Sequence, residues 1–139
     1  MVSVFLLGAW YSFINNYNFF SVENKFFFDK SNLQILSGFT SNMITEHDKV
    51  TIPEIKMLVT NVPYNIKYTS NFKENATLIL GSQGMFTSHS NDKSALNELI
   101  PNANSNDLGM YSLLQFSKNN FETQIGFRYD HRSIETEED

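Results

Sequence analysis

Apolar and polar residues alternate along most of this chain with a period of two. The clearest run lies near the C-terminus, where one set of alternate positions is mostly apolar (Phe121, Thr123, Ile125, Phe127 and Tyr129). The intervening set is polar or small (Glu122, Gln124, Gly126, Arg128, Asp130 and Arg132). A period of two places the two sets on opposite sides of a sheet. The pattern therefore predicts a strand with one apolar face and one polar face.

The same alternation, less pure, recurs in five earlier segments. Together the runs predict six strands, at residues 17–28, 33–40, 55–69, 76–86, 110–116 and 121–132. In the third, Ile55, Met57 and Val59 extend the strand upstream of Pro63, and a proline inside a strand predicts an edge, a bulge or a kink with a shift of phase. In the first, the three consecutive residues Phe26, Phe27 and Phe28 blur the alternation.

Short and long connections alternate between these predicted strands. Short polar turns fall at residues 29–32, 72–75 and 117–120, and longer polar stretches at 46–53, 88–107 and 133–139. Residues 93–100, followed by Pro101, predict a short helical turn inside the second long stretch. Strict alternation places all short turns at one end of the sheet, which is typical of outer-membrane barrels. The predicted fold is all-β: an antiparallel meander of about six long strands, part of a transmembrane β-barrel, spanning residues 17–139, with residues 1–16 unassigned.

Composition narrows the functions that the chain can have. Among 139 residues, 13 Phe and 6 Tyr accompany only 18% charged residues, and the net charge of -5 with scattered Lys and Arg argues against a nucleic-acid partner. The absence of Cys excludes thiol redox chemistry and thiolate metal sites. No window has the roughly 18 apolar residues of a membrane-spanning helix, so any crossing of a membrane is expected to use strands.

Four segments carry a resemblance to a known family. In order they are residues 78–84 (LILGSQG), 99–101 (LIP) in an Asn-rich loop, 109–116, and 125–130 (IGFRYD). Their order, the loop lengths and the turn positions resemble the barrel region of TonB-dependent outer-membrane receptors, over residues 19–139. The last segment is similar to the recurrent Gly-x-Arg-Tyr-Asp strand of that family.

The resemblance implies a location in the bacterial outer membrane and a role in the uptake of a substrate such as an iron chelate, cobalamin or a glycan. In that family a plug domain precedes the barrel, and an N-terminal motif contacts the TonB-type energising complex. The sequence shows no segment similar to the plug, no such motif and no signal peptide with a basic start, since Lys25 is the first basic residue. The chain is therefore expected to be a fragment whose partners are membrane lipid, the rest of the barrel and the plug.

Several residues suggest sharper chemistry, and for each a structural role is the prediction. Arg128 and Asp130 are expected to pair across strands with neighbouring residues of the lumen face. The three histidines, His47, His89 and His131, lack the spacing of metal ligands, and Asp130 and His131 with Ser133 or Ser90 lack a nucleophile elbow. The aromatic residues are predicted to form the lipid face and its interfacial girdles: Phe19, Phe20, Phe26, Phe27, Phe28, Tyr64, Tyr68, Phe127 and Tyr129.

The sequence thus predicts a receptor or transport barrel segment that is not an enzyme and has no cofactor, catalytic residue or metal ligand. The loop at residues 88–107 is the part expected to meet a substrate or partner. The alternative is a soluble β-barrel that binds a small apolar ligand in its interior, which similar strands would also encode. The two differ in whether the apolar face is sealed or turned outward.

Overall fold

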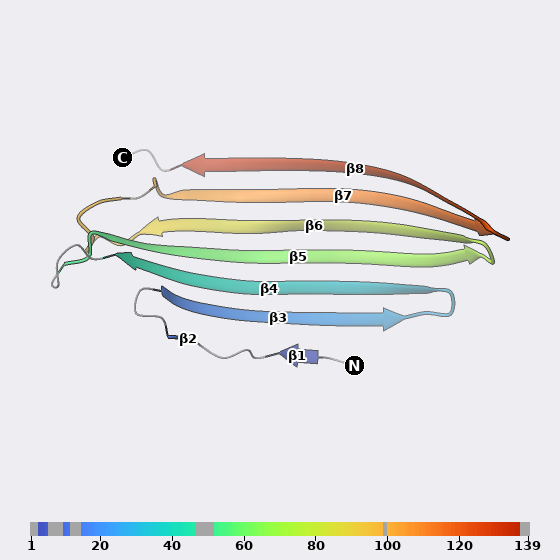
Figure 1. Ribbon diagram of the computed structural model, residues 1–139, viewed down its shortest axis with the longest axis horizontal. Helices are drawn as coiled ribbons and strands as arrows, with labels where there is room; N and C mark the ends of the chain where they lie inside the picture. Colours follow the sequence, from blue (N-terminus) through green and yellow to red (C-terminus); the bar gives the residue numbers. More distant parts are fainter. Residues whose placement is uncertain (1–2, 6–9, 12–14, 47–51, 99, 137–139) are drawn as a thin grey trace.

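A computed structural model describes residues 3–5, 10–11, 15–46, 52–98 and 100–136 of the chain. These residues form one antiparallel sheet with the strand order β1-β3-β4-β5-β6-β7-β8, with β2 also paired to β3 (Figure 1). The strands are β1 (Ser3–Phe5), β2 (Trp10–Tyr11), β3 (Asn15–Phe27), β4 (Ser31–Glu46), β5 (Ile55–Lys73), β6 (Ala76–Asn91), β7 (Ala103–Lys118) and β8 (Phe121–Thr136).

The predicted six-stranded antiparallel meander is confirmed by strands β3 to β8. Each pairs with its neighbours in the sequence, and β8 pairs only with β7, so the sheet is not closed. The three tight connections, around residues 28–30, 74–75 and 119–120, lie at one end of the sheet and the longer ones at the other (Figure 1). At the last hairpin Asn119 has φ 57, a left-handed conformation that Asn tolerates better than most residues.

The strands are longer than the alternation predicted, and the loop at residues 88–107 is correspondingly shorter. β6 continues to Asn91 and β7 begins at Ala103, because both strands keep pairing beyond the apolar part of their sequence. Among the described residues of 93–100 there is no helical turn, so that prediction was wrong. Instead Ser94 N–H donates to the side chain of Asp92, while the amides of Leu96 and Asn97 donate to the carbonyls of Pro53 and Glu54 in the neighbouring loop.

Pro63 lies in the middle of β5 without shifting the register, contrary to the predicted change of phase. Ser37 pairs with Tyr64 and Thr40 pairs with Asn61, which is one unbroken alignment on either side of the proline. The glycine opposite makes this possible: a Cβ on Gly38 would lie 3.2 Å from the Pro63 ring. Because the phase does not change, Ile55, Met57 and Val59 face the opposite side from Tyr64, Ile66 and Tyr68. The irregularity of β5 occurs instead between Asn71 and Lys73, near the hairpin.

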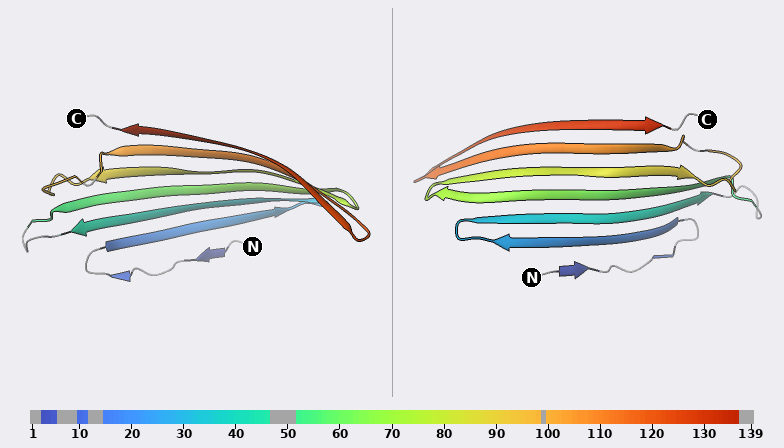
Figure 2. Two further views of the ribbon diagram at one scale, coloured as in Figure 1. Left: turned by 45° about the horizontal axis from the view of Figure 1, so that its top comes forward. Right: turned by 180° about the vertical axis from the view of Figure 1, so that it is seen from behind.

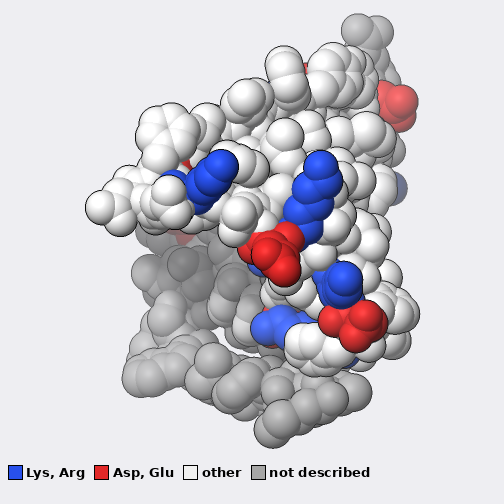
Figure 3. Space-filling model, turned by 90° about the vertical axis from the view of Figure 1, so that its right-hand side faces the viewer, with Lys and Arg blue, Asp and Glu red and all other residues white. Residues whose placement is uncertain are grey.

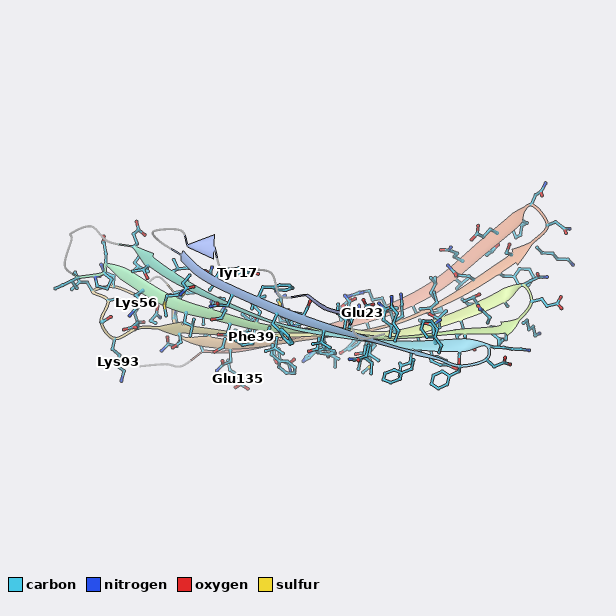
Figure 4. All side chains as sticks on the ribbon, turned by 90° about the horizontal axis from the view of Figure 1, so that it is seen from below. Tyr17, Glu23, Phe39, Lys56, Lys93 and Glu135 are labelled. Carbon is cyan, nitrogen blue, oxygen red and sulfur yellow. The ribbon has the colours of Figure 1, made fainter. Side chains whose placement is uncertain are left out.

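The register assigns each strand residue to one of two faces, because paired residues point to the same side. One face, called the apolar face below, carries Phe20, Phe39, Ile66, Leu80 and Phe127 and the residues in phase with them. The other, called the polar face, carries Glu23, Asn61, Gln83, Asp107 and Arg128 and those in phase with them. Figure 4 shows the sheet bent, with Tyr17 and Glu23 on its hollow side and Phe39 and Glu135 on the other.

The sheet forms a single curved layer, and neither face of it is covered (Figure 2). Among the described residues, only Met57 and Ala76 are buried apolar side chains, and no polar or charged side chain is buried. A sheet normally buries one face against a second layer. The core that such a sheet requires is therefore not supplied by the described part of the chain.

Two tyrosine rings lie over glycines of β6 and fill the space that a side chain would occupy. A Cβ on Gly81 would lie 2.1 Å from the ring of Tyr111 on the polar face, and one on Gly84 would lie 2.7 Å from the ring of Tyr64 on the apolar face. Such cross-strand cover of a glycine by an aromatic ring fixes register and stiffens the strand.

We predict that Gly81→Ala destabilises the folded sheet by about 1–3 kcal/mol, because the methyl group must displace the ring of Tyr111. The measurement is urea unfolding of Gly81→Ala, Tyr111→Ala and the double variant. If the ring causes the effect, the glycine substitution costs less in the Tyr111→Ala background. Gly126→Ala is the control, since its Cβ would meet only the end of Leu113 at 3.3 Å and a carbonyl oxygen at 3.4 Å. Equal costs in both backgrounds would contradict the packing argument.

Candidate functional site

The apolar face is the most distinctive surface of the molecule, because it combines exposed apolar side chains with an absence of charge over its middle. In strands β3 to β8 the described charged residues on this face are Lys56, Lys73, Lys118 and Glu135, all near strand ends. Fifteen large apolar side chains on it are exposed: Phe20, Phe26, Phe39, Val62, Ile66, Tyr68, Leu80, Phe86, Met110, Leu114, Phe116, Phe121, Ile125, Phe127 and Tyr129. Contiguous apolar surfaces of this kind mark sites of contact with a membrane or a partner.

The apolar band runs obliquely across the strands. At the loop end of β4 the first polar residue past the band is Ser41, whose row of register partners runs through Thr60, Ser88 and Asn104 to Glu135. In β8 the first polar residue past the band is His131, four residues short of Glu135.

The hairpin end of the band is displaced in the same direction. The row of Leu33, where the band begins in β4, reaches β8 at Phe127, six residues from Phe121, where the band begins in β8. The band drifts by four to six residues along the strand direction over four strand steps. With ~3.3 Å per residue and ~4.8 Å between strands, the strands are inclined by about 35–45° to the normal of the band. Barrel strands tilt by a similar amount, roughly 35–45°.

The polar face carries most of the charge and encloses a hollow. Its charged strand residues are Glu23, Lys25, Glu46, Lys67, Asp107, Glu122, Arg128, Asp130 and Arg132. The hollow, with a volume of about 750 Å³, extends across β3 to β8 and is lined mainly by side chains of this face, among them Asn65, Gln83, Asp107, Arg128 and Arg132. At the hairpin end, Lys and Arg lie beside Asp and Glu (Figure 3). The sheet therefore has one charged, polar face and one apolar face.

Two ion pairs lie in the hollow, one within β8 and one that connects β8 to β7. The guanidinium of Arg128 binds both carboxylate oxygens of Asp130, two residues along β8, at 2.7 and 2.6 Å. The guanidinium of Arg132 binds Asp107 of β7, its partner in the register, at 2.5 and 2.7 Å. The predicted cross-strand pairing of Arg128 and Asp130 was wrong, because the two residues pair with each other along β8. The cross-strand pair of Arg132 was missed, because the partner of a strand residue depends on a register that alternation alone does not reveal.

Toward the loop end, the polar face is lined with amides and hydroxyls. Asn61 of β5 joins its two neighbouring strands, donating to the Thr40 hydroxyl at 3.0 Å and accepting from the Thr87 hydroxyl at 2.8 Å. Nearby, the side-chain atoms Asn42 Oδ1, His89 Nδ1 and Asn91 Oδ1 are shielded from solvent without a hydrogen-bond partner. This part of the polar face therefore contains buried polar atoms that the described residues leave unpaired.

The two long connections are tied together above this region. Lys56 Nζ lies 2.6 Å from Asp92 Oδ2, and the amide of Asp92 donates to the carbonyl of Lys56 at 2.8 Å. Across the base of the same loop, the amide of Asn91 donates to the side chain of Asn102 at 2.7 Å. The ammonium of Lys56 and the hydrogen bond from Ser94 hold the pKa of Asp92 well below its usual value near 3.8. The loops thus form a braced rim that exposes Ile52 and Leu96.

The structure separates the residues for which metal or hydrolytic chemistry was considered. His89 faces the polar side and His131 the apolar side, and His47 lies outside the described residues. No group of three or more His, Asp or Glu residues in the described ranges could hold a metal ion. Asp130 lies on the polar face with Arg128, whereas His131, Ser133 and Ser90 are on the other, so these residues do not form a triad.

The aromatic residues divide between the faces less cleanly than predicted. Phe20, Phe26, Tyr64, Tyr68, Phe127 and Tyr129 are on the apolar face, as expected. Phe19 and Phe27 are on the polar face, and Phe28 is in the hairpin turn. The assignment of Phe19 and Phe27 to the lipid face was wrong, because adjacent residues of a strand must point to opposite sides.

Comparison with known proteins adds no relative. No protein-family model, no curated protein and no solved structure matches this chain. Within the described ranges, no helix has the length and apolar character needed to cross a membrane.

We predict that Asp92→Asn loosens the braced rim, because it removes the charge that pairs with Lys56. The expected result at neutral pH is faster hydrogen exchange at the amides of Leu96 and Asn97. In the unsubstituted chain the lowered pKa of Asp92 means that the brace is complete above pH ~4 and is lost only as the pH falls below 3.8 toward the lowered pKa. Glu98→Gln, an exposed change in the same loop, is the control. Exchange that is unchanged in Asp92→Asn would show that backbone bonds alone hold the rim.

Proposed function

We propose that this chain forms part of the wall of a TonB-dependent receptor in the bacterial outer membrane, where its apolar face contacts lipid and its polar face lines the passage for a substrate. The single observation that carries the proposal is the separation of charge between the faces. Over the middle of the sheet, charged residues are confined to the polar face, while the apolar face is exposed. In transmembrane barrels the outward band is apolar and the interior is polar.

The oblique course of the band supports the same proposal. A membrane is a slab of constant thickness, so strands that cross it at a tilt place their apolar segments at progressively different positions in the register. The drift of about one residue or more per strand and the inferred tilt of about 35–45° are what a barrel wall requires. A flat sheet that packs against a second layer has no reason to show this drift.

The open edge of β8 indicates that further strands complete the wall. Its sixteen residues hydrogen bond only to β7, and unpaired backbone groups within lipid cost several kcal/mol each. Six strands are also too few for the purpose, because about eight are needed before an interior accommodates even its own side chains. The hollow lined by Arg128, Arg132 and Gln83 therefore fits the inner wall of a larger barrel.

The alternative is a soluble β-barrel that encloses a small apolar ligand. In such a protein the apolar face lines the interior and the polar face meets solvent. The bend of the sheet weighs against this alternative, since the side chains that line the larger hollow belong mainly to the polar face. The two arrangements nevertheless make opposite predictions for the accessibility of the apolar face.

Nitroxide labels on single introduced cysteines can distinguish the two arrangements. Because the chain has no Cys, each label is confined to the chosen position. In lipid bilayers, labels at Ile66 and Leu80 are expected to be accessible to oxygen, which concentrates in the hydrocarbon. Labels at Asn65 and Gln83, on the polar face, are expected to be accessible to a water-soluble nickel chelate. In the soluble alternative the first pair would be shielded from both reagents, and that result would overturn the proposal.

A matched pair of arginine substitutions on β5 gives a second prediction. Ile66→Arg places a cation in the middle of the apolar band and is expected to cost about 2–4 kcal/mol in bilayers, the range measured for the lipid-facing midplane. Asn65→Arg, its neighbour on the polar face, is expected to cost far less. Unfolding by urea in lipid vesicles measures both. Equal costs for the two variants would contradict the assignment of the faces.

A further inference from the structure

A second hollow lies on the apolar face, just past the loop end of the apolar band. It has a volume of about 380 Å³, within the range of small-molecule sites, which is roughly 300–1,000 Å³. Thr60, Ser88, Asn104 and Glu135 line it as consecutive partners in one row of the register across β5 to β8, and Ser133 and Asn106 lie beside them. The same row continues through Ser41 in β4 to Asn18 in β3, so it crosses six strands.

The side chains that line this hollow suit a neutral polar ligand. Hydroxyl and amide side chains both donate and accept hydrogen bonds, as sugar hydroxyls do, and the carboxylate of Glu135 accepts them. Ser88, Asn104 and Glu135 are exposed and so available to a ligand. The residues lining the hollow include no Lys or Arg, whereas phosphate and acidic lipid headgroups are recognised through clusters of basic residues.

The hollow adjoins the apolar band, and this position favours an amphiphile as the ligand. Val62 and Phe86 line it and also belong to the exposed apolar band, with Phe86 half exposed at 51%. An occupant would therefore contact polar groups on one side and the edge of the apolar band on the other. That combination suits the headgroup of an amphiphile whose acyl chains lie along the band.

From this arrangement we infer that the row of Asn18, Ser41, Thr60, Ser88, Asn104 and Glu135 binds the sugar headgroups of glycolipids in the outer leaflet, with the hollow at Ser88, Asn104 and Glu135 as its centre. The inference depends on the proposed function, because it requires the apolar band to lie in lipid. It adds a ligand for the outward side of the wall, separate from any substrate that passes along the polar face.

The test measures the partition of the full chain into vesicles of phosphatidylcholine, either alone or with digalactosyldiacylglycerol. The chain is refolded without detergents that have sugar headgroups. The chain is expected to float with both, and more tightly with the glycolipid. In the variant Ser88→Ala with Asn104→Ala, the extra affinity for the glycolipid is expected to fall by roughly tenfold or more, given about fivefold to tenfold for each net hydrogen bond lost.

The matched control is Thr77→Ala with Gln115→Ala, which removes a hydroxyl and an amide from a paired position of the same two strands on the polar face. This control is expected to keep the preference for the glycolipid. Equal partition into both vesicles, or a preference for phosphatidylglycerol instead, would each overturn the glycolipid inference while leaving the proposed function intact. Failure to float with any vesicle would overturn the proposed function and the inference together.

Discussion

The register of β3 to β8, which shifts only between Asn71 and Lys73 beside a hairpin, is the constraint on which every other feature of this sheet depends. Side chains alternate along a strand, so a slip of one residue anywhere would exchange the faces of all the strands beyond it. The most vulnerable place is Pro63, which cannot donate a backbone hydrogen bond to a neighbouring strand. Gly38 leaves room for the proline ring and the pairing resumes in phase at once, so that Phe39 and Phe86 remain on the same side.

The preserved register produces two surfaces with opposite requirements. On one side, amides and ion pairs such as Arg132 with Asp107 are satisfied by each other and by water. On the other, Phe127 is 75% exposed with no second layer of protein to cover it. Each such side chain gains roughly 1.5–3 kcal/mol on transfer out of water, so the structure gains stability only when something apolar lies against that face. Under the proposed function a bilayer would provide this cover without a protein core, and it would account both for the scarcity of buried residues among those described and for the charge-free band.

The sequence predicted the six long strands, their order and the alternation of short and long connections, since all of these follow from the period of two and from polar turn residues. It predicted less well where pairing continues without apolar alternation, as in the loop ends of β6 and β7. The phase at Met57 and Val59 and the faces of Phe19 and Phe27 were assigned wrongly, because apolar residues were taken to share one face. In the structure these residues lie on the polar face, where Met57 is buried. Cross-strand partners such as Arg132 and Asp107 could not be predicted from the sequence, because they depend on the register between strands.

The meander has a consequence for how such a wall is made. Each of the strands β3 to β8 pairs only with strands adjacent or nearly adjacent in the sequence, so the contacts of every hairpin close over short stretches of chain. Sheets built from such local contacts gain order by adding one unit to the next, as repeat proteins do, without waiting for distant segments to meet. In the proposed wall, the exposed edge of β8 would be the end at which the sheet grows, and its unpaired backbone groups would direct the pairing of a further strand.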